Sequence, residues 1–232
     1  MSDNWRTHAK FWSTQYEVHA IDQRNHGKSF HSQDFDYDLM AADIIRYMDD
    51  RNIPQAIVLG HSMGGKTAMN MALQYPTRVS KLIVADIAPK KYDVDTKFSN
   101  IIRGLLHLDD LTLNSRSEAD KLLMPFVPEM GVRQFLLKNL AWTEQKTLKL
   151  RCNIEVLQHK LKEIGAAPTG LPYTGKTLFL AGKQSDYVLQ TDMTIIQDLF
   201  PKASLHWVAD AGHWLHAENP KGFTISLQDF LS

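Results

Sequence analysis

A serine with glycines on both sides, Gly60-His61-Ser62-Met63-Gly64, joins two apolar segments of different periodicity. The segment before it, AIVLG, is β-branched and apolar like a buried strand. The segment after it, Gly64–Tyr75, has helical spacing and stops at a proline. A serine at such a strand–turn–helix junction is typical of a nucleophile elbow, in which a tight turn exposes the hydroxyl and needs small residues beside it. The alternative, a glycine-rich turn that arose by chance, does not account for both flanking segments.

The apolar runs of the whole chain predict an α/β fold with a mostly parallel sheet flanked by helices. Asp36 can cap a helix with Met40, Ile44 and Met48 on one face, and Asn219-Pro220 can open a last helix. Helical patterns fall between most of the runs that are rich in β-branched residues or leucine. Five such runs are predicted strands: Tyr16–Asp22, Ala56–His61, Lys81–Asp86, Thr177–Gly182 and Ser204–Ala209.

The stretch of residues 90–173 has helical periodicity and no convincing strand. Its apolar stripes are Ile102, Leu105 and Leu106, then Val132, Phe135 and Leu136, then Ile154, Leu157 and Leu161. The stretch is too long for a plain connection between two strands. We therefore expect residues 1–89 and 174–232 to form the core, with residues 90–173 inserted as a helical lid.

The composition excludes several classes of protein. The 232 residues carry 26 Lys and Arg against 26 Asp and Glu, so the basic surface of a nucleic-acid binder is not expected. The single cysteine, Cys152, excludes an intrachain disulfide. The polar first residues do not resemble a signal peptide, and no run approaches the roughly 20 apolar residues of a membrane span. We expect a cytoplasmic protein without a membrane partner, and the oligomeric state is left open.

A nucleophilic serine needs a base, and His213 is the best candidate among ten histidines. It follows the last predicted strand, in agreement with the chain order of serine, acid and histidine in such enzymes. His216 is interpreted as a surface or packing residue, and His61 as a wall of the substrate pocket. The N–H of Met63, at the helix start, can bind a developing oxyanion. No sequence pattern indicates a metal site, and no cofactor is expected.

Six segments carry a more specific resemblance. Together they are similar to a branch of the α/β-hydrolase superfamily that holds small bacterial serine esterases and the related animal abhydrolase-domain proteins of mitochondria. The resemblance implies a serine carboxylic-ester hydrolase, and its substrate range includes thioesters such as acyl-CoA. The segments are RNHGKS (24–29), GHSMGGK (60–66), DIAP (86–89), RQFLLKNL (133–140), AGKQSDYV (181–188) and AGHWLHAENP (211–220).

The triad acid departs from the commoner pattern of that superfamily, which is G-x-x-D after the strand that follows the lid. Here Ser185 stands in the acid's place, and Asp186 comes one residue late. Asp86 ends the strand before the lid, where it can reach the same histidine. Members of the resembled branch also have this serine and this aspartate. We favour Asp86 over Asp186, with Ser185 as a hydrogen-bonding neighbour; the alternative for Asp86 is a helix cap or a loop salt bridge.

The resemblance also implies an amino-terminal part without counterpart in these residues. The family has a second oxyanion donor in a histidine–glycine loop, just before a segment like Ser2–Trp5. It also has three further strands, one of which normally lies between the segments Tyr16–Asp22 and Ala56–His61. We therefore expect the first strands of the fold to be missing, and the working enzyme to be longer by about 20 or more residues.

The leading functional hypothesis is a serine esterase that acts through an acyl-enzyme on small to medium acyl groups, in a pocket between the sheet edge and the lid. A carbon–carbon bond hydrolase, a perhydrolase or a peptidase would use the same triad. A non-catalytic remnant of the fold is the alternative from a different class. Ser62 in the nucleophile position excludes enzymes with an aspartate nucleophile.

Overall fold

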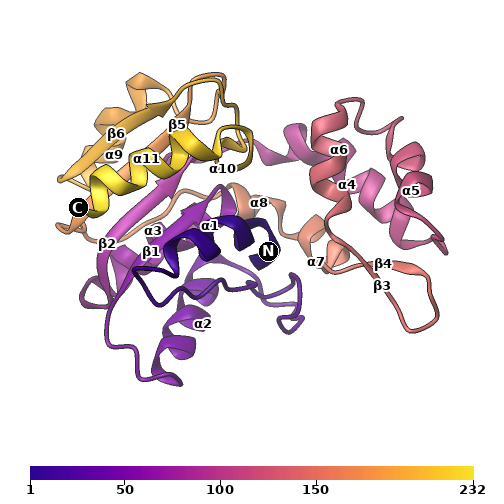
Figure 1. Cartoon of the computed structure of the whole chain (residues 1–232), viewed down its shortest axis with the longest axis horizontal. Coiled ribbons are helices and arrows are strands. Elements are labelled where there is room, and N and C mark those ends of the chain that lie inside the picture. The colour runs from indigo at the N-terminus through magenta and orange to yellow at the C-terminus, as the bar shows by residue number, and fades with distance from the viewer. The chain divides into compact units, whose positions relative to one another are not determined.

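The computed structural model describes the backbone of residues 1–232 and the side chains of all of them except residues 95–97. The chain forms two compact units (Figure 1). The sheet unit consists of Asp36–Tyr92 and Ala166–Ser232, and the helical unit of Met1–Phe35 and Asp93–Gly165. The division into a core and a lid at residues 90 and 173 stays a prediction.

A parallel four-stranded sheet lies at the centre of the sheet unit, in the order β1-β2-β5-β6 (Figure 1). Its strands are β1 (Ala56–His61), β2 (Val79–Ala85), β5 (Lys176–Gly182) and β6 (Ala203–Val208). Four of the five predicted strands are thereby confirmed to within two residues at either end. The register sets His61 beside Ala85 and Gly182 beside Val208. Because all four strands run the same way, the loops that follow them meet at one edge of the sheet.

Two helices of this unit, α2 and α11, begin at the caps that the sequence predicts. The Asp36 carboxylate accepts a hydrogen bond from the Leu39 N–H, and the Asn219 side chain accepts one from the Gly222 N–H, so both predicted caps are confirmed. The helices are α2 (Tyr37–Asp49), α3 (Met63–Gln74), α9 (Met193–Leu199), α10 (Leu215–Glu218) and α11 (Pro220–Leu231), with 3₁₀ turns η2 (Pro76–Arg78) and η3 (Gln190–Asp192).

Both faces of the sheet are buried. On one face the strands pack against α2, α3 and α9, through residues that include Met48, Met69, Val84, Phe179 and Ile196. The residues next to these along the strands, such as Ile83 beside Val84 and Leu178 beside Phe179, are equally buried and point to the other face. There α11 contacts β5 and β6. A strand buried on both faces reads as a continuous apolar run, which is why the sequence reveals it.

The fifth predicted strand, Tyr16–Asp22, is wrong. The segment has no regular secondary structure, and residues 16–20 are exposed. Its apolar and polar residues alternate as in a strand, but a strand also needs a neighbour that pairs with its N–H and C=O groups. None of the six strands pairs with this segment. Alternation of apolar and polar residues predicts which side chains would share a face of a strand. It does not predict whether a neighbouring strand is present to pair with that strand.

The helical unit contains seven helices with described backbones and one small sheet. They are η1 (Ser2–Trp5), α1 (Arg6–Trp12), α4 (Val94–Asp109), α5 (Arg116–Leu123), α6 (Met130–Leu137), α7 (Ile154–His159) and α8 (Leu161–Gly165). The expectation that residues 90–173 contain no strand is wrong, because β3 (Leu140–Trp142) and β4 (Leu148–Leu150) form an antiparallel hairpin. Strands of three residues are too short to show a period.

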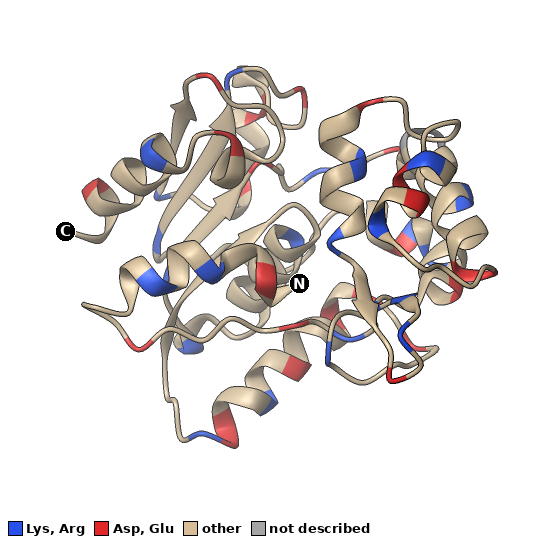
Figure 2. Cartoon of the chain, turned by 45° about the vertical axis from the view of Figure 1, so that its right-hand side comes forward, with Lys and Arg blue, Asp and Glu red and all other residues tan. Residues whose placement is uncertain are grey.

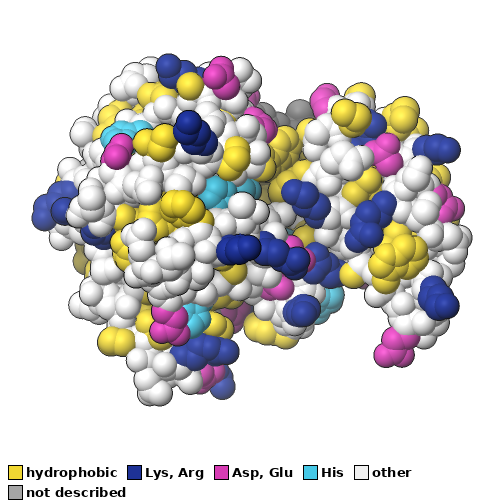
Figure 3. All heavy atoms as spheres, in the orientation of Figure 1, with side chains coloured by type: hydrophobic (Ala, Val, Ile, Leu, Met, Phe, Trp, Pro, Cys, Tyr) yellow, Lys and Arg dark blue, Asp and Glu magenta, His cyan; other side chains and the backbone are white. Residues whose placement is uncertain are grey.

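Charges of both signs are spread over the surface (Figure 2), and their totals are equal. In Figure 2, Lys and Arg occur on the same helices as Asp and Glu, and Figure 3 shows several separate groups of hydrophobic side chains. In the described part of the chain, no helix combines the length and the apolar character that crossing a membrane demands.

Lys66, in the first turns of α3, is a buried amine whose side chain donates hydrogen bonds to backbone carbonyls. Its side chain is 1% exposed. Nζ donates to the carbonyl oxygens of Lys90, at 2.5 Å, and Ala166, and it lies 5.0 Å from the centre of the Tyr92 ring. Burial lowers the pKa of the Lys66 ammonium from 10.5 to about 7. A neutral amine still has two N–H donors, so both hydrogen bonds survive the loss of the proton.

This buried amine predicts a stability that rises with pH. Between about pH 7 and pH 10 the unfolded chain holds a proton on Lys66 that the folded chain has lost, so raising the pH favours folding. We expect the free energy of unfolding of the wild type, relative to Lys66→Met, to rise by up to about 1.4 kcal/mol per pH unit in that window. Urea unfolding of both proteins at several pH values measures it. The exposed Lys202→Met is the control, and a difference between wild type and Lys66→Met that does not change with pH would contradict the assignment.

Candidate active site

Ser62 occupies a strained turn between β1 and α3. Its φ is 54° and its ψ is −119°, a region that residues with a side chain rarely adopt. Such a conformation persists only when the surrounding structure holds it. Here the Ser62 N–H donates to the Ala85 carbonyl at 3.0 Å, and the Lys66 N–H donates to the Ser62 carbonyl at 3.0 Å. The turn has the backbone that the glycine-flanked serine predicts.

Two of the three glycines around Ser62 are required by close approach. A Cβ at Gly60 would lie 2.1 Å from the Gly64 carbonyl oxygen, and one at Gly65 would lie 2.6 Å from the Ile87 side chain. A Cβ at Gly64 would point into open space, with no other atom within 4 Å. The small residues that the turn is expected to need are therefore required at Gly60 and Gly65, and the space around Gly64 sets no such requirement.

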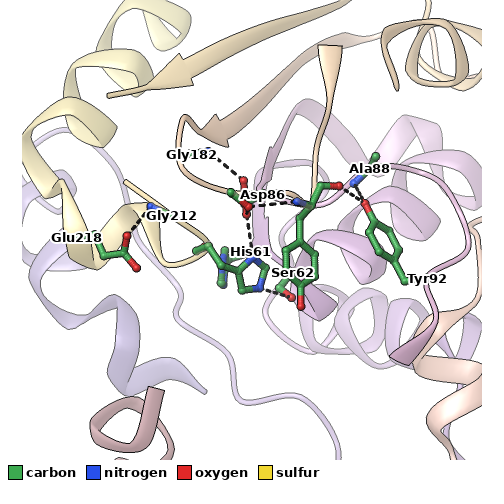
Figure 4. A network of polar contacts seen from close by, with 11 residues as sticks. His61, Ser62, Asp86, Ala88, Tyr92, Gly182, Gly212 and Glu218 are labelled. Carbon is green, nitrogen blue, oxygen red and sulfur yellow. Dashed lines mark hydrogen bonds and ion pairs between the residues drawn. The ribbon is translucent and has the colours of Figure 1, made fainter. Parts of the chain in front are cut away.

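The structure brings Ser62, His213 and Asp86 together at the carboxyl edge of the sheet. His213 Nε2 lies 3.0 Å from Ser62 Oγ, and His213 Nδ1 lies 2.8 Å from Asp86 Oδ2. Ser62 follows β1 and Asp86 follows β2 (both are labelled in Figure 4), and His213 lies in the loop after β6. This hydrogen-bonded series has the arrangement of a nucleophile, a base and the acid that orients the base.

Asp86 is fully buried, with a φ of 51° directly after β2. Its Oδ1 accepts from the Gly182 N–H at 2.9 Å (Figure 4), and its Oδ2 accepts from the Ser185 hydroxyl as well as from His213. These donors fix the plane of the carboxylate. Asp186 is exposed. The geometry thus favours Asp86 as the partner of His213, and it places Ser185 against that carboxylate as a hydrogen-bonding neighbour.

His61 supports the loop that carries His213. Its Nε2 lies 2.6 Å from the His213 carbonyl oxygen, to which it donates. Burial, together with the nearby His213 and His216, holds the pKa of His61 well below its usual range, so the ring is neutral near pH 7. A neutral His61 ring adds no positive charge beside His213. The contribution of His61 to a pocket wall stays a prediction.

Further groups hold the same loop. The Gly212 N–H donates to Glu218 Oε2 at 2.5 Å (Figure 4). His216, interpreted from the sequence as a surface or packing residue, is buried and not at the surface; its ring lies 4.7 Å from that of His61 and edge-on to Phe223. The ring of Tyr187 stacks on the ring of His213. Glu218 and Tyr187 are not identified by the sequence, because nothing in their spacing distinguishes them from other surface residues.

Met63 is the first residue of α3, and its N–H therefore belongs to the end of the helix where donors lack an intrahelical acceptor. Such an N–H, at the positive end of the helix dipole, suits a developing oxyanion. Among the residues with described side chains, no group of three or more His, Cys, Asp and Glu is placed to hold a metal ion.

Comparisons with known proteins agree with the α/β architecture of this chain. The family described as alpha/beta hydrolase fold matches residues 1–122. The chain is 35% identical to an abhydrolase domain-containing protein of Schizosaccharomyces pombe, over 99% of this chain and 87% of that protein. It is 39% identical to a Danio rerio protein named sn-1-specific diacylglycerol lipase ABHD11, over 94% of this chain and 70% of that protein.

The solved structure of a marine microorganism esterase is also similar. It has a TM-score of 0.92 and 36% identity, and the match covers 99% of this chain and 90% of the esterase. The matching family, the relatives that align with nearly all of this chain, and the parallel sheet with its elbow lead to the same assignment: this chain belongs to the alpha/beta hydrolase fold family.

Proposed function

We propose that this chain is a serine hydrolase that cleaves carboxylic esters through an acyl-enzyme. The observation that carries the proposal is the continuous series from Ser62 Oγ through His213 to Asp86, with Ser62 held in a strained turn at a helix start. The names of the relatives, an esterase and a lipase, support ester substrates.

In the first half of the reaction, His213 Nε2 takes the proton of the Ser62 hydroxyl while Oγ attacks the ester carbonyl carbon. The carbonyl oxygen becomes an oxyanion, to which the Met63 N–H donates. The tetrahedral intermediate collapses, the bond to the leaving oxygen breaks, and His213 gives its proton to that oxygen. The alcohol leaves, and the acyl group stays on Ser62.

In the second half, His213 takes a proton from water, whose oxygen attacks the acyl carbon. Collapse of the second intermediate returns the proton to Ser62 and releases the carboxylic acid. Asp86 accepts from the Nδ1–H of His213 throughout, which keeps Nε2 unprotonated in the resting enzyme and stabilises the imidazolium that forms.

The proposal also specifies the acyl group and the leaving group of the substrate. We propose small to medium acyl groups, and thioesters are cleaved by the same steps with a thiolate in place of the alkoxide. The Danio rerio relative, whose name specifies diacylglycerol, favours a lipase of longer acyl chains as the second candidate. A carbon–carbon bond hydrolase, a perhydrolase or a peptidase would share the triad. A cytoplasmic location stays a prediction.

A series of p-nitrophenyl esters, from acetyl to palmitoyl and below the concentration of micelle formation, tests the proposal. We expect a burst of p-nitrophenol equal to the enzyme concentration, because acylation by these activated esters should be faster than hydrolysis of the acyl-enzyme. We also expect a maximum rate at the short or medium chains. A maximum at palmitoyl, with cleavage of diacylglycerol at its sn-1 ester, would instead establish the lipase. Absence of both burst and turnover would favour the non-catalytic remnant.

A further inference from the structure

The ring of Tyr187 lies flat against the ring of His213, and no step of the proposed reaction uses it. The two ring centres are 3.9 Å apart and the planes differ by 21°. Tyr187 belongs to the loop that follows β5. It comes two residues after Ser185 in the sequence.

Hydrogen bonds hold Tyr187 in this position from both sides of its backbone. Its N–H donates to Ser185 Oγ at 3.2 Å, and that hydroxyl donates to Asp86. Its carbonyl accepts from the Tyr92 hydroxyl at 2.5 Å, and this hydroxyl accepts from the Ala88 N–H at 2.8 Å (Figure 4 labels Ala88 and Tyr92). The Tyr92 ring is itself stacked on that of Tyr187, with centres 5.7 Å apart. The carboxylate that orients His213 thus also anchors the residue that covers its ring.

The face of an aromatic ring carries partial negative charge and attracts a cation that lies over it. His213 is neutral in the resting enzyme of the proposed mechanism and an imidazolium in both transition states. A parallel ring at 3.9 Å therefore stabilises the transition states more than the resting state, which is the condition for faster catalysis. The tyrosine hydroxyl takes no part in this, and burial raises the pKa of Tyr187 to about 12, so the phenol stays neutral.

We propose that Tyr187 is a positioning residue whose ring holds the His213 imidazole in the plane of the triad and stabilises its protonated form. The proposal rests on the proposed function for its effect on turnover, and its effect on the protonation of His213 is independent of turnover. The other groups that face the His213 ring are Asp86 after β2, Ser62 at the elbow, His61 at the end of β1 and the neighbouring Trp214.

Two substitutions separate the ring from the hydroxyl. Tyr187→Phe keeps the stack, and we expect its kcat to stay within about twofold of the wild type. Tyr187→Leu removes the stack, and we expect kcat to fall by roughly 3- to 30-fold, the range of a cation on an aromatic face, with little change in KM. The acid-side midpoint of its kcat/KM profile should move to lower pH by about 0.5 to 1.5 units, because a less stabilised imidazolium forms only at lower pH. Tyr47→Leu, on α2, is the matched control.

An NMR titration of the His213 ring in proteins labelled with ¹³C-histidine reads the same effect without any turnover. If the wild type were to cleave no ester, the proposed function would fail, yet the Tyr187→Leu titration should still move to lower pH. Phenylalanine analogues with one, two and three ring fluorines at position 187 keep the shape of the ring while weakening its negative face. These analogues keep the proposal testable if the leucine variant does not fold. Each added fluorine should lower the midpoint of the His213 titration further.

A His213 titration that is the same in the wild type, Tyr187→Leu and the fluorinated series would overturn the proposal. A fall in kcat without movement of the acid-side midpoint would also overturn it, since it would show that Tyr187 only supports the loop.

Discussion

Ser62→Ala is expected to lower the turnover of a p-nitrophenyl ester by on the order of 10⁶ and to leave the fold intact. Without the hydroxyl, no acyl-enzyme forms, and His213 and the helix start can only assist a direct attack by water. Alanine at a φ of 54° carries the same strain as serine, so the melting temperature should stay close to that of the wild type.

Stopped-flow and steady-state assays on the same preparations measure this effect. Ser80→Ala, at an exposed position in β2, is the control and should keep full activity. A Ser62→Ala protein that is folded and retains a tenth of the wild-type turnover would rule Ser62 out as the nucleophile.

Asp86→Asn is expected to lower kcat by about 10⁴, whereas Asp186→Asn should have little effect. An asparagine can still accept from the Gly182 N–H, but it carries no negative charge, and its amide can donate to His213 Nδ1. The ring would then present the wrong tautomer to Ser62. The two substitutions make the same chemical change, one at a buried carboxylate that contacts His213 and one at an exposed carboxylate.

Circular dichroism and thermal unfolding of both variants show whether a loss of kcat comes from a loss of structure. If Asp186→Asn were the more damaging of two folded variants, Asp186 would be the triad acid, and the hydrogen bond between Asp86 and His213 would have only a structural role.

The sequence predicts the features of this fold that depend on neighbouring residues. Short segments of sequence suffice to predict the caps at Asp36 and Asn219, the buried strands and the elbow at Ser62. Each of these features depends on local backbone geometry or on burial on both faces of the sheet. The pairing of Asp86 with His213 could be anticipated because parallel strands end at a common edge.

Features that depend on distant partners could not be predicted in this way. The segment Tyr16–Asp22 has the alternation of a strand and lacks a strand to pair with it, and the hairpin of β3 and β4 is too short to show a period. The stack of Tyr187 on His213 joins residues of two loops whose approach is set by the whole sheet unit. The role of His61 depends likewise on a carbonyl far away in the sequence.

The most direct test of an acyl-enzyme at Ser62 is the mass of the protein after reaction with a fluorophosphonate, followed by mapping of the modified peptide. The mechanism predicts one adduct per chain, located on Ser62, and no adduct in Ser62→Ala. An adduct on a different serine, or an unmodified wild-type protein that nevertheless hydrolyses esters, would contradict it.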